Sequence, residues 1–154
     1  MVLHQRKPNR LQEYNYSQPG HYFVTICTHR KKDWFGDFIN DEIALNNYGK
    51  VAKQCWEEIP AHFENVYLDE YIVLPNHIHG ILIVNTLVGN RHACSLRRQN
   101  QTLPVVIGSF KSAVSKSIND SLRNDLFRWQ KSFYDHVIRN EKSLYKIRHY
   151  INQN

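Results

Sequence analysis

The chain has 154 residues, of which 42% are hydrophobic and 12% aromatic, which is enough for one domain with a single core and too few for two. Its 20 lysines and arginines outnumber 14 acidic residues and leave a net charge of +6. A basic balance of this size also occurs on ordinary soluble proteins, so it favours a polyanionic partner such as nucleic acid without establishing one.

The start of the chain, MVLHQRKPNRLQEYNYSQPG, lacks the apolar core of a signal peptide. The longest apolar run is far shorter than the roughly 20 residues that cross a bilayer. Cys27, Cys55 and Cys94 are far apart and odd in number, which argues against a disulfide framework and against a Cys-x-x-Cys zinc site. We therefore expect a soluble protein of the reducing cytoplasm that has no membrane partner.

The first half of the chain predicts a strand, a hairpin and a helix. Residues 21–29, HYFVTICTH, are rich in β-branched and aromatic side chains and follow a Pro-Gly turn, which is typical of a strand. Residues 34–45 alternate short apolar patches around Asn-Asp, which favours a small peripheral hairpin. Apolar residues every four positions predict a helix over 47–59, which Pro60 would stop.

The middle of the chain predicts two strands and a long connection. Residues 65–75 and 77–84 form two strand patterns close enough to pair as an antiparallel hairpin. Residues 85–102 show no sustained period, and a structureless connection of this length is typically functional or mobile. Pro104 can then open a helix with an apolar stripe, and residues 132–138 predict a further strand.

The last predicted element is a helix that Asn140 can cap and that carries Leu144, Ile147 and Ile151 on one face. The resulting order is βαββαβ with one added helix. We therefore expect an α+β fold over residues 1–154 as a single domain. Its ferredoxin-like antiparallel sheet would have helices on one face and an added C-terminal helix.

Two histidines interrupt the apolar run YIVLPNHIHGILIV at residues 71–84. Successive strand residues point to opposite faces, so His77 and His79 share one face and Ile78 points to the other. Two neighbouring imidazoles on a rigid strand are a good start on a divalent metal site, which still needs a third ligand. The alternative is a pair of hydrogen-bonded structural histidines at a strand end.

The last helix offers a partner for these histidines. On a wheel of about 100° per residue, Tyr150 and Asn154 lie together beside the apolar stripe, while Tyr145 falls toward solvent. Tyr150 would present a phenol nucleophile, and Asn154 would present a side-chain oxygen to a metal held by the histidines. The alternative for Tyr150 is a residue at the core edge with its hydroxyl in water.

Three segments resemble the HUH single-strand transposases with one catalytic tyrosine, a family that includes the REP-associated tyrosine transposases. LPNHIHGIL is similar to the family's His-hydrophobic-His strand, WQKSFYDHVIRNEKSLYKIRHYINQN to its C-terminal signature, and YNYSQPGHYFVTICTH to its first strand. The resemblance extends from about Tyr14 to Asn154. It implies that His77 and His79 bind a divalent ion, Mg²⁺ or Mn²⁺, that Tyr150 is the nucleophile, and that Asn154 completes the metal site.

The resemblance also implies a reaction and a substrate. The family cleaves and joins single-stranded DNA, often with a hairpin, through a covalent 5′-phosphotyrosine bond. Some members of the family are monomers, and others are homodimers that complete their sites in trans. The oligomeric state of this protein therefore stays open. The rival hypotheses are an inactive relative retained for binding and a non-enzymatic single-stranded nucleic-acid-binding module, although the aromatic signature of an RRM is absent.

Basic clusters are the candidate phosphate contacts, although each alone is also typical of a solvated surface. They are Arg6, Lys7, Arg10, Arg30, Lys31, Lys32, Arg97 and Arg98.

Overall fold

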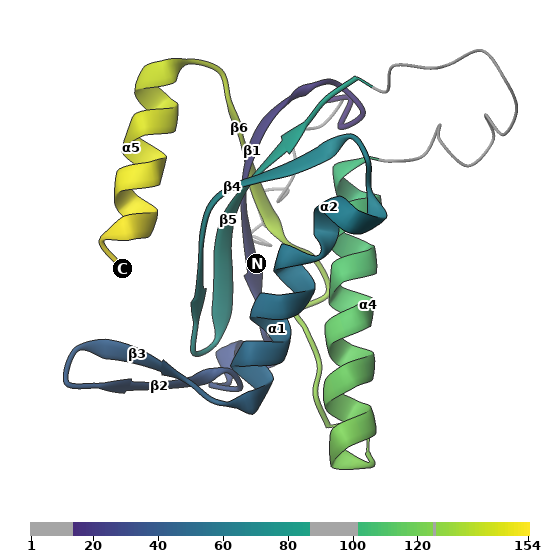
Figure 1. Cartoon of the computed structure of the whole chain (residues 1–154), viewed down its shortest axis with the longest axis vertical. Coiled ribbons are helices and arrows are strands. Elements are labelled where there is room, and N and C mark those ends of the chain that lie inside the picture. Colours follow the sequence, from purple (N-terminus) through teal and green to yellow (C-terminus); the bar gives the residue numbers. More distant parts are fainter. Residues whose placement is uncertain (1–13, 87–101, 125) are drawn as a thin grey trace, which may run out of the picture.

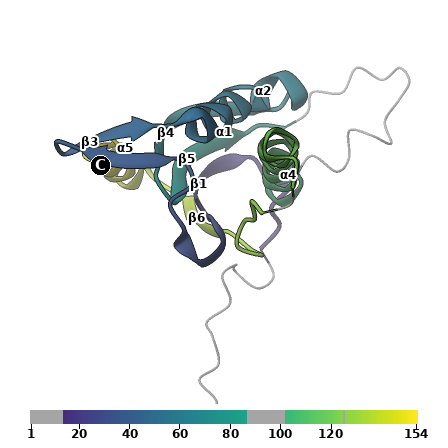
Figure 2. The same cartoon turned by 90° about the horizontal axis from the view of Figure 1, so that it is seen from below.

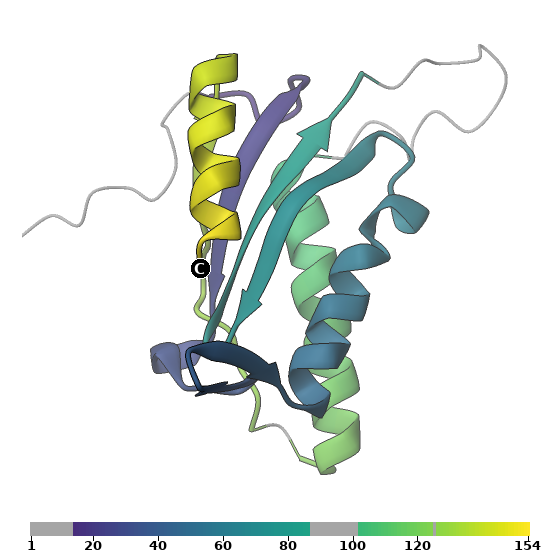
Figure 3. The ribbon, with the colours of Figure 1, turned by 60° about the vertical axis from the view of Figure 1, so that its left-hand side comes forward.

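The computed structural model describes residues 14–86, 102–124 and 126–154. Its main sheet has four antiparallel strands in the order β4-β5-β1-β6. Figure 1 shows the element order, and Figure 3 shows α1 and α4 covering one face of the sheet while α5 lies on the other. The elements are β1 Gly20–Cys27, η1 His29–Lys31, β2 Gly36–Ile39, β3 Glu42–Leu45, α1 Asn47–Glu57, α2 Ile59–His62, β4 Val66–Leu74, β5 His77–Val84, α4 Leu103–Leu122, β6 Tyr134–Ile138 and α5 Glu141–Asn152.

This architecture confirms the predicted α+β class and the ferredoxin-like βαββαβ order with an added C-terminal helix. The predicted hairpin is also present as the β2–β3 ribbon, whose turn residues Asn40 and Asp41 both have positive φ. Both central residues of a type I′ turn need positive φ, and Asn and Asp tolerate it well. The ribbon projects from the end of the sheet toward the side where α5 lies (Figures 1 and 2).

The helix expected over 47–59 is shorter than predicted. The α1 helix ends at Glu57, and a separate short helix, α2, begins at Ile59. Pro60 therefore lies in the first turn of α2, where the missing N–H of proline is not needed, and it starts a helix as well as ending one. The side chain of Asn46 caps α1 by accepting from the Gly49 backbone N–H at 3.0 Å.

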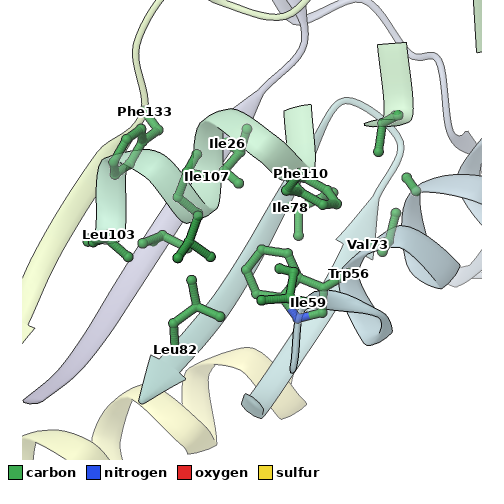
Figure 4. Close-up of a cluster of buried hydrophobic side chains, with 14 of the residues drawn as sticks. Ile26, Trp56, Ile59, Val73, Ile78, Leu82, Leu103, Ile107, Phe110 and Phe133 are labelled. Atoms are coloured by element: carbon green, nitrogen blue, oxygen red, sulfur yellow. The ribbon is translucent and has the colours of Figure 1, made fainter. Parts of the chain in front are cut away.

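The main core lies between the sheet and the layer of α1 and α4 (Figure 4). Trp56 of α1 is fully buried there and packs edge-to-face against Phe110 of α4. The indole lies directly over Gly80 of β5, where an added Cβ would come within 2.3 Å of a Trp56 ring carbon. A glycine at this position lets the large ring approach the sheet backbone closely.

A second, smaller cluster lies on the opposite face of the sheet. Its buried members are Ile81 of β5, Ile138 of β6, and Leu144 and Ile151 of α5. The α5 helix begins at the predicted cap, because the Asn140 side chain accepts from the Ser143 backbone N–H at 2.8 Å. The predicted apolar stripe of this helix therefore faces the sheet.

Some predictions concern residues outside the described ranges. Most of the long connection, residues 87–101, is among them, as are the basic residues Arg6, Lys7, Arg10, Arg97 and Arg98. Across the described ranges, no helix has both the length and the apolar composition needed to cross a membrane.

Candidate metal and nucleophile site

The two histidines lie on the face of β5 that α5 covers. Their Nε2 atoms are 3.1 Å apart, and the rings meet edge-to-face. His79 is buried and His77 half-buried, whereas Ile78 between them is fully buried in the opposite core. The alternation of a strand therefore brings the imidazoles together, as the sequence indicates.

The spacing of the two Nε2 atoms fits one shared cation. Two nitrogen ligands at about 2.1 Å from an ion, with angles between those of octahedral and tetrahedral geometry, lie roughly 3.0 to 3.4 Å apart. The observed separation of 3.1 Å falls in this range. The pair can thus hold a divalent ion in the positions that the side chains already occupy.

Hydrogen bonds fix the orientation of His77. Its Nδ1 lies 2.7 Å from Oδ1 of Asn76, and the amide of Asn76 donates to the Asp33 carboxylate at 2.8 Å. Because a carboxylate only accepts, the Asn76 atom that faces Asp33 is the amide nitrogen, and the atom that faces His77 is the amide oxygen. An amide oxygen only accepts, so Nδ1 of His77 is the donor. The neutral ring then presents an Nε2 lone pair, which is the form that binds metal.

His79 is held by the hydroxyl of Thr25, whose Oγ1 lies 2.8 Å from Nδ1. A hydroxyl can donate or accept. When the Thr25 hydroxyl accepts from Nδ1–H of His79, the Nε2 lone pairs of His77 and His79 face each other. A cation between the two nitrogens removes the repulsion between these lone pairs. When Thr25 donates, the Nε2–H of His79 donates to His77. The same threonine therefore suits both the ion-bound and the ion-free pair.

Both imidazoles are neutral near pH 7. Burial is the main cause that lowers the pKa of His79 to about 4, and repulsion from a protonated His77 is the second cause. Burial is also the main cause that lowers the pKa of His77, followed by the positive charge of Lys31. Neutral imidazole is the ligand form, so protons do not compete for the pair at neutral pH.

Tyr150 of α5 reaches the histidine pair. Its hydroxyl oxygen lies 3.4 Å from Nε2 of His79, and its ring contacts the rings of His79 and Phe23 edge-on. Phe23 in turn stacks on His79 with the ring centroids 5.3 Å apart. About half of the Tyr150 surface is exposed (49%), so a large substrate can reach the phenol.

The other tyrosines near the C-terminus lie elsewhere. Tyr145 is 71% exposed and stacks on His149 on the outer side of α5. Tyr134 is half exposed on β6. The helical wheel therefore selected the residue that the fold brings to the histidines.

The Asn154 side chain makes a hydrogen bond within its own helix. Its side-chain amide donates to the backbone carbonyl of Tyr150 at 2.6 Å. Carbonyls in the last turn of a helix have no partner within the helix, and a side chain just past the end can satisfy one of them. Over the described ranges, no His, Cys, Asp or Glu forms a group of three that could hold a metal. The structure thus joins His77, His79 and Tyr150 and shows Asn154 bound to its own helix.

A basic turn adjoins His77. Residues 30–32, Arg-Lys-Lys, are exposed and lie shortly after β1, which ends at Cys27. The backbone N–H of Thr28 donates to the Asn76 carbonyl and that of Trp34 to the Pro75 carbonyl, each at 2.9 Å. These bonds fix the basic turn to the turn that precedes His77, which is why the charge of Lys31 lowers the pKa of that imidazole.

Sequence reasoning missed the three polar residues that orient the imidazoles. Thr25 shares a face of β1 with Phe23 and stands opposite His79 in the register, and a polar residue in an apolar strand is a usable signal. Asn76 directly precedes the first histidine, but its side-chain bond and the contribution of Asp33 depend on the turn geometry.

The fold matches that of a solved transposase structure. The chain superimposes on the structure of a REP-associated tyrosine transposase bound to a REP hairpin with a TM-score of 0.58, over 92% of this chain and 69% of that one. The identity is 16%, so this match shows a shared fold of the tyrosine transposase type.

The chain is also 37% identical over 164 aligned positions to a Haemophilus influenzae protein described as uncharacterized, across 99% of this chain and 89% of the relative. It belongs to the same family as that protein. No family model matches the chain.

Proposed function

We propose that this protein is a metal-dependent enzyme that cleaves single-stranded DNA and transfers the strand through a covalent bond to Tyr150. The observation that carries the proposal is the convergence of the phenol and the imidazole pair, with Tyr150 Oη 3.4 Å from His79 Nε2 and the two Nε2 atoms 3.1 Å apart. The fold, which is shared with a transposase bound to a DNA hairpin, supports this choice over other nucleophilic chemistry.

The residues divide the chemistry between them. His77 and His79 would hold Mg²⁺ or Mn²⁺, which when bound supplies a Lewis acid for the phosphate oxygens. The oxygen of Tyr150 attacks the phosphorus, so a tyrosine O–P bond forms while the bond to the 3′ oxygen of the neighbouring nucleotide breaks. The phenolic proton leaves to solvent, and the released 3′ oxygen takes one up. One phosphodiester replaces another, which permits strand transfer without hydrolysis.

The basic turn would bind the DNA backbone beside the scissile phosphate. Arg30, Lys31 and Lys32 are exposed, and backbone hydrogen bonds join their turn to the turn that precedes His77. A strand laid against this turn would place one phosphate at the imidazole pair. Each phosphate contact to a single strand contributes about 0.7 to the slope of log affinity against log salt. Lys31→Met should therefore reduce the slope by about this amount.

The experiment is incubation of labelled single-stranded DNA bearing a hairpin with the protein in Mn²⁺, followed by a denaturing gel. We expect a covalent adduct that EDTA and His77→Ala abolish. Tyr150→Phe should bind the strand and form no adduct. Tyr145→Phe is the matched control, because it removes a hydroxyl from the exposed side of the same helix and should leave the adduct unchanged.

Two results would count against the proposal. An adduct that persists in Tyr150→Phe would assign the nucleophile elsewhere. Tight binding of the strand by the wild-type protein without an adduct in Mg²⁺ or Mn²⁺ would favour the non-catalytic binding module.

A further inference from the structure

A β-bulge interrupts β4, a strand that α5 covers on one face of the sheet. In the pairing of β4 with β5, Leu68 stands opposite Leu82 and Tyr71 opposite Gly80, so β4 uses one more residue than β5 between these pairs. The extra residue lies in the Asp69-Glu70 segment, and the Glu70 backbone N–H donates to the Asp69 carboxylate at 2.8 Å. A bulge redirects side chains from the regular alternation of a strand.

At the bulge, the side chain of Asp69 bonds to α5. The carboxylate accepts from Nε of Arg148 with both oxygens at 3.1 Å and from a terminal guanidinium nitrogen at 2.6 Å. The Asp69 side chain is only 11% exposed, and that of Arg148 is 43% exposed. A forked ion pair of this kind fixes direction as well as distance. Ile72 of β4 also packs against the small apolar cluster of this face, so the ion pair adds a directional contact to an apolar one between α5 and this strand.

Arg148 and Tyr150 flank the apolar stripe of α5 from opposite sides. Measured from Ile151 on a wheel of about 100° per residue, Arg148 lies about 60° to one side and Tyr150 about 100° to the other. The ion pair holds the Arg148 flank on β4, while the Tyr150 flank reaches His79 on β5. The helix is therefore held against rolling about its axis.

We infer that Asp69 and Arg148 are positioning residues that set the Tyr150 hydroxyl at the imidazole pair, an inference that rests on the proposed function. A roll of about 20° would move a side-chain tip 5 to 6 Å from the helix axis by roughly 2 Å. Misplacement of a reacting group by about 1 Å can cost on the order of 100-fold in rate. The apolar stripe alone permits such a roll, because aliphatic contacts have no preferred direction.

The test compares the full-length wild-type protein with Asp69→Asn and Arg148→Met in the adduct assay at saturating hairpin DNA. We expect each substitution to slow adduct formation about 10- to 100-fold. The Mn²⁺ affinity should stay within about twofold, because the imidazole pair shares no partner with Asp69 or Arg148. Glu70→Gln is the matched control, since it removes a neighbouring charge from the bulge and leaves the ion pair intact.

Two results at this step would overturn the inference. Adduct rates for Asp69→Asn and Arg148→Met equal to the wild-type rate would show that the ion pair does not position Tyr150. Weaker DNA binding by Arg148→Met together with tighter binding by Asp69→Asn, which frees the guanidinium, would instead make Arg148 a phosphate contact.

The inference stays testable if the wild-type protein forms no adduct and the proposed function fails. Hydrogen exchange of the α5 amides should then still be faster in Asp69→Asn than in Glu70→Gln, while the β5 amides exchange as in the wild type. Equal exchange of α5 in the two variants would overturn the positioning role independently of any catalysis.

Discussion

Replacing Gly80 by alanine tests the packing that places His79. The new Cβ would lie 2.3 Å from Trp56 Cζ2 and 2.9 Å from Cη2, whereas carbon atoms pack best at about 3.5 to 4.0 Å. The indole cannot easily withdraw, because it is fully buried and packs edge-to-face on Phe110, with its ring centroid also 6.1 Å from that of Tyr71. Either the ring or β5 must shift by more than 1 Å.

Overpacking of this kind costs about 1 to 3 kcal/mol, and the short contact places Gly80→Ala near the upper end. Alanine loses less backbone entropy than glycine when a strand forms, and this difference offsets roughly 0.5 to 1 kcal/mol of the cost. We therefore expect a net loss of about 2 kcal/mol, which in a domain of this size lowers the melting temperature by about 4 to 8 °C. Urea and thermal unfolding followed by circular dichroism measure both quantities.

Two further variants test whether the clash with Trp56 causes the loss of stability in Gly80→Ala. Gly108→Ala is the same substitution at an exposed site of α4 with no atom within 4 Å of the new Cβ. It should raise stability by about 1 kcal/mol through helix propensity. In a Trp56→Phe background, which removes the ring atoms that clash, Gly80→Ala should cost less than about 1 kcal/mol. A wild-type stability for Gly80→Ala, or an equal cost in both backgrounds, would refute the steric explanation.

Three further outcomes follow from the site and from α5. Thr25→Val should lower the Mn²⁺ affinity about 10- to 100-fold without unfolding the protein, because an outer hydrogen bond orients His79; electron paramagnetic resonance titration measures this, and an unchanged affinity would contradict it. Asn140→Ala should lower the free energy of unfolding by about 1 kcal/mol in urea, since it removes a helix cap; no loss would disprove the cap. Burial alone would raise the pKa of Asp69, but the hydrogen bonds from Arg148 and from the Glu70 backbone N–H, together with the positive charge of Arg148, outweigh burial, so the pKa lies below its usual value. A depressed carboxyl pKa stabilises the folded state above the usual value of about 3.9, and this contribution is lost as the pH falls through the folded pKa, so the stability gap between wild type and Asp69→Asn should shrink below about pH 4. A gap that stays constant in urea titrations down to pH 2 would contradict this assignment.

Regular geometry explains what the sequence predicted well. The two-residue period of a strand put His77 and His79 on one face and Ile78 on the other. The period of the helix likewise separated Tyr150 from Tyr145. Both results depend only on the spacing of residues within one helix or strand, and this spacing can be read directly from the sequence.

Contacts between distant residues explain what was missed. The bulge in the Asp69-Glu70 segment interrupts the alternation of β4, and no periodicity predicts that Asp69 meets Arg148, 79 residues later. The Asn154 amide donates to the Tyr150 carbonyl in the last turn of α5, and a helical wheel does not predict this contact because it gives only the direction in which each side chain leaves the helix. Pattern analysis locates faces, but which side chains on a face meet is decided by bulges, turns and caps.

The close approach of Trp56 to Gly80 also gives the protein an internal spectroscopic reporter. The indole lies against Gly80 on one face of β5. The adjacent residue, His79, projects from the other face together with His77. In the described part of the chain the buried Nε1 of Trp56 has no hydrogen-bond partner, so its N–H proton should resonate apart from those of hydrogen-bonded indoles. Paramagnetic Mn²⁺ at the histidines should broaden this resonance through a single strand, and a diamagnetic ion such as Mg²⁺ should leave its width unchanged.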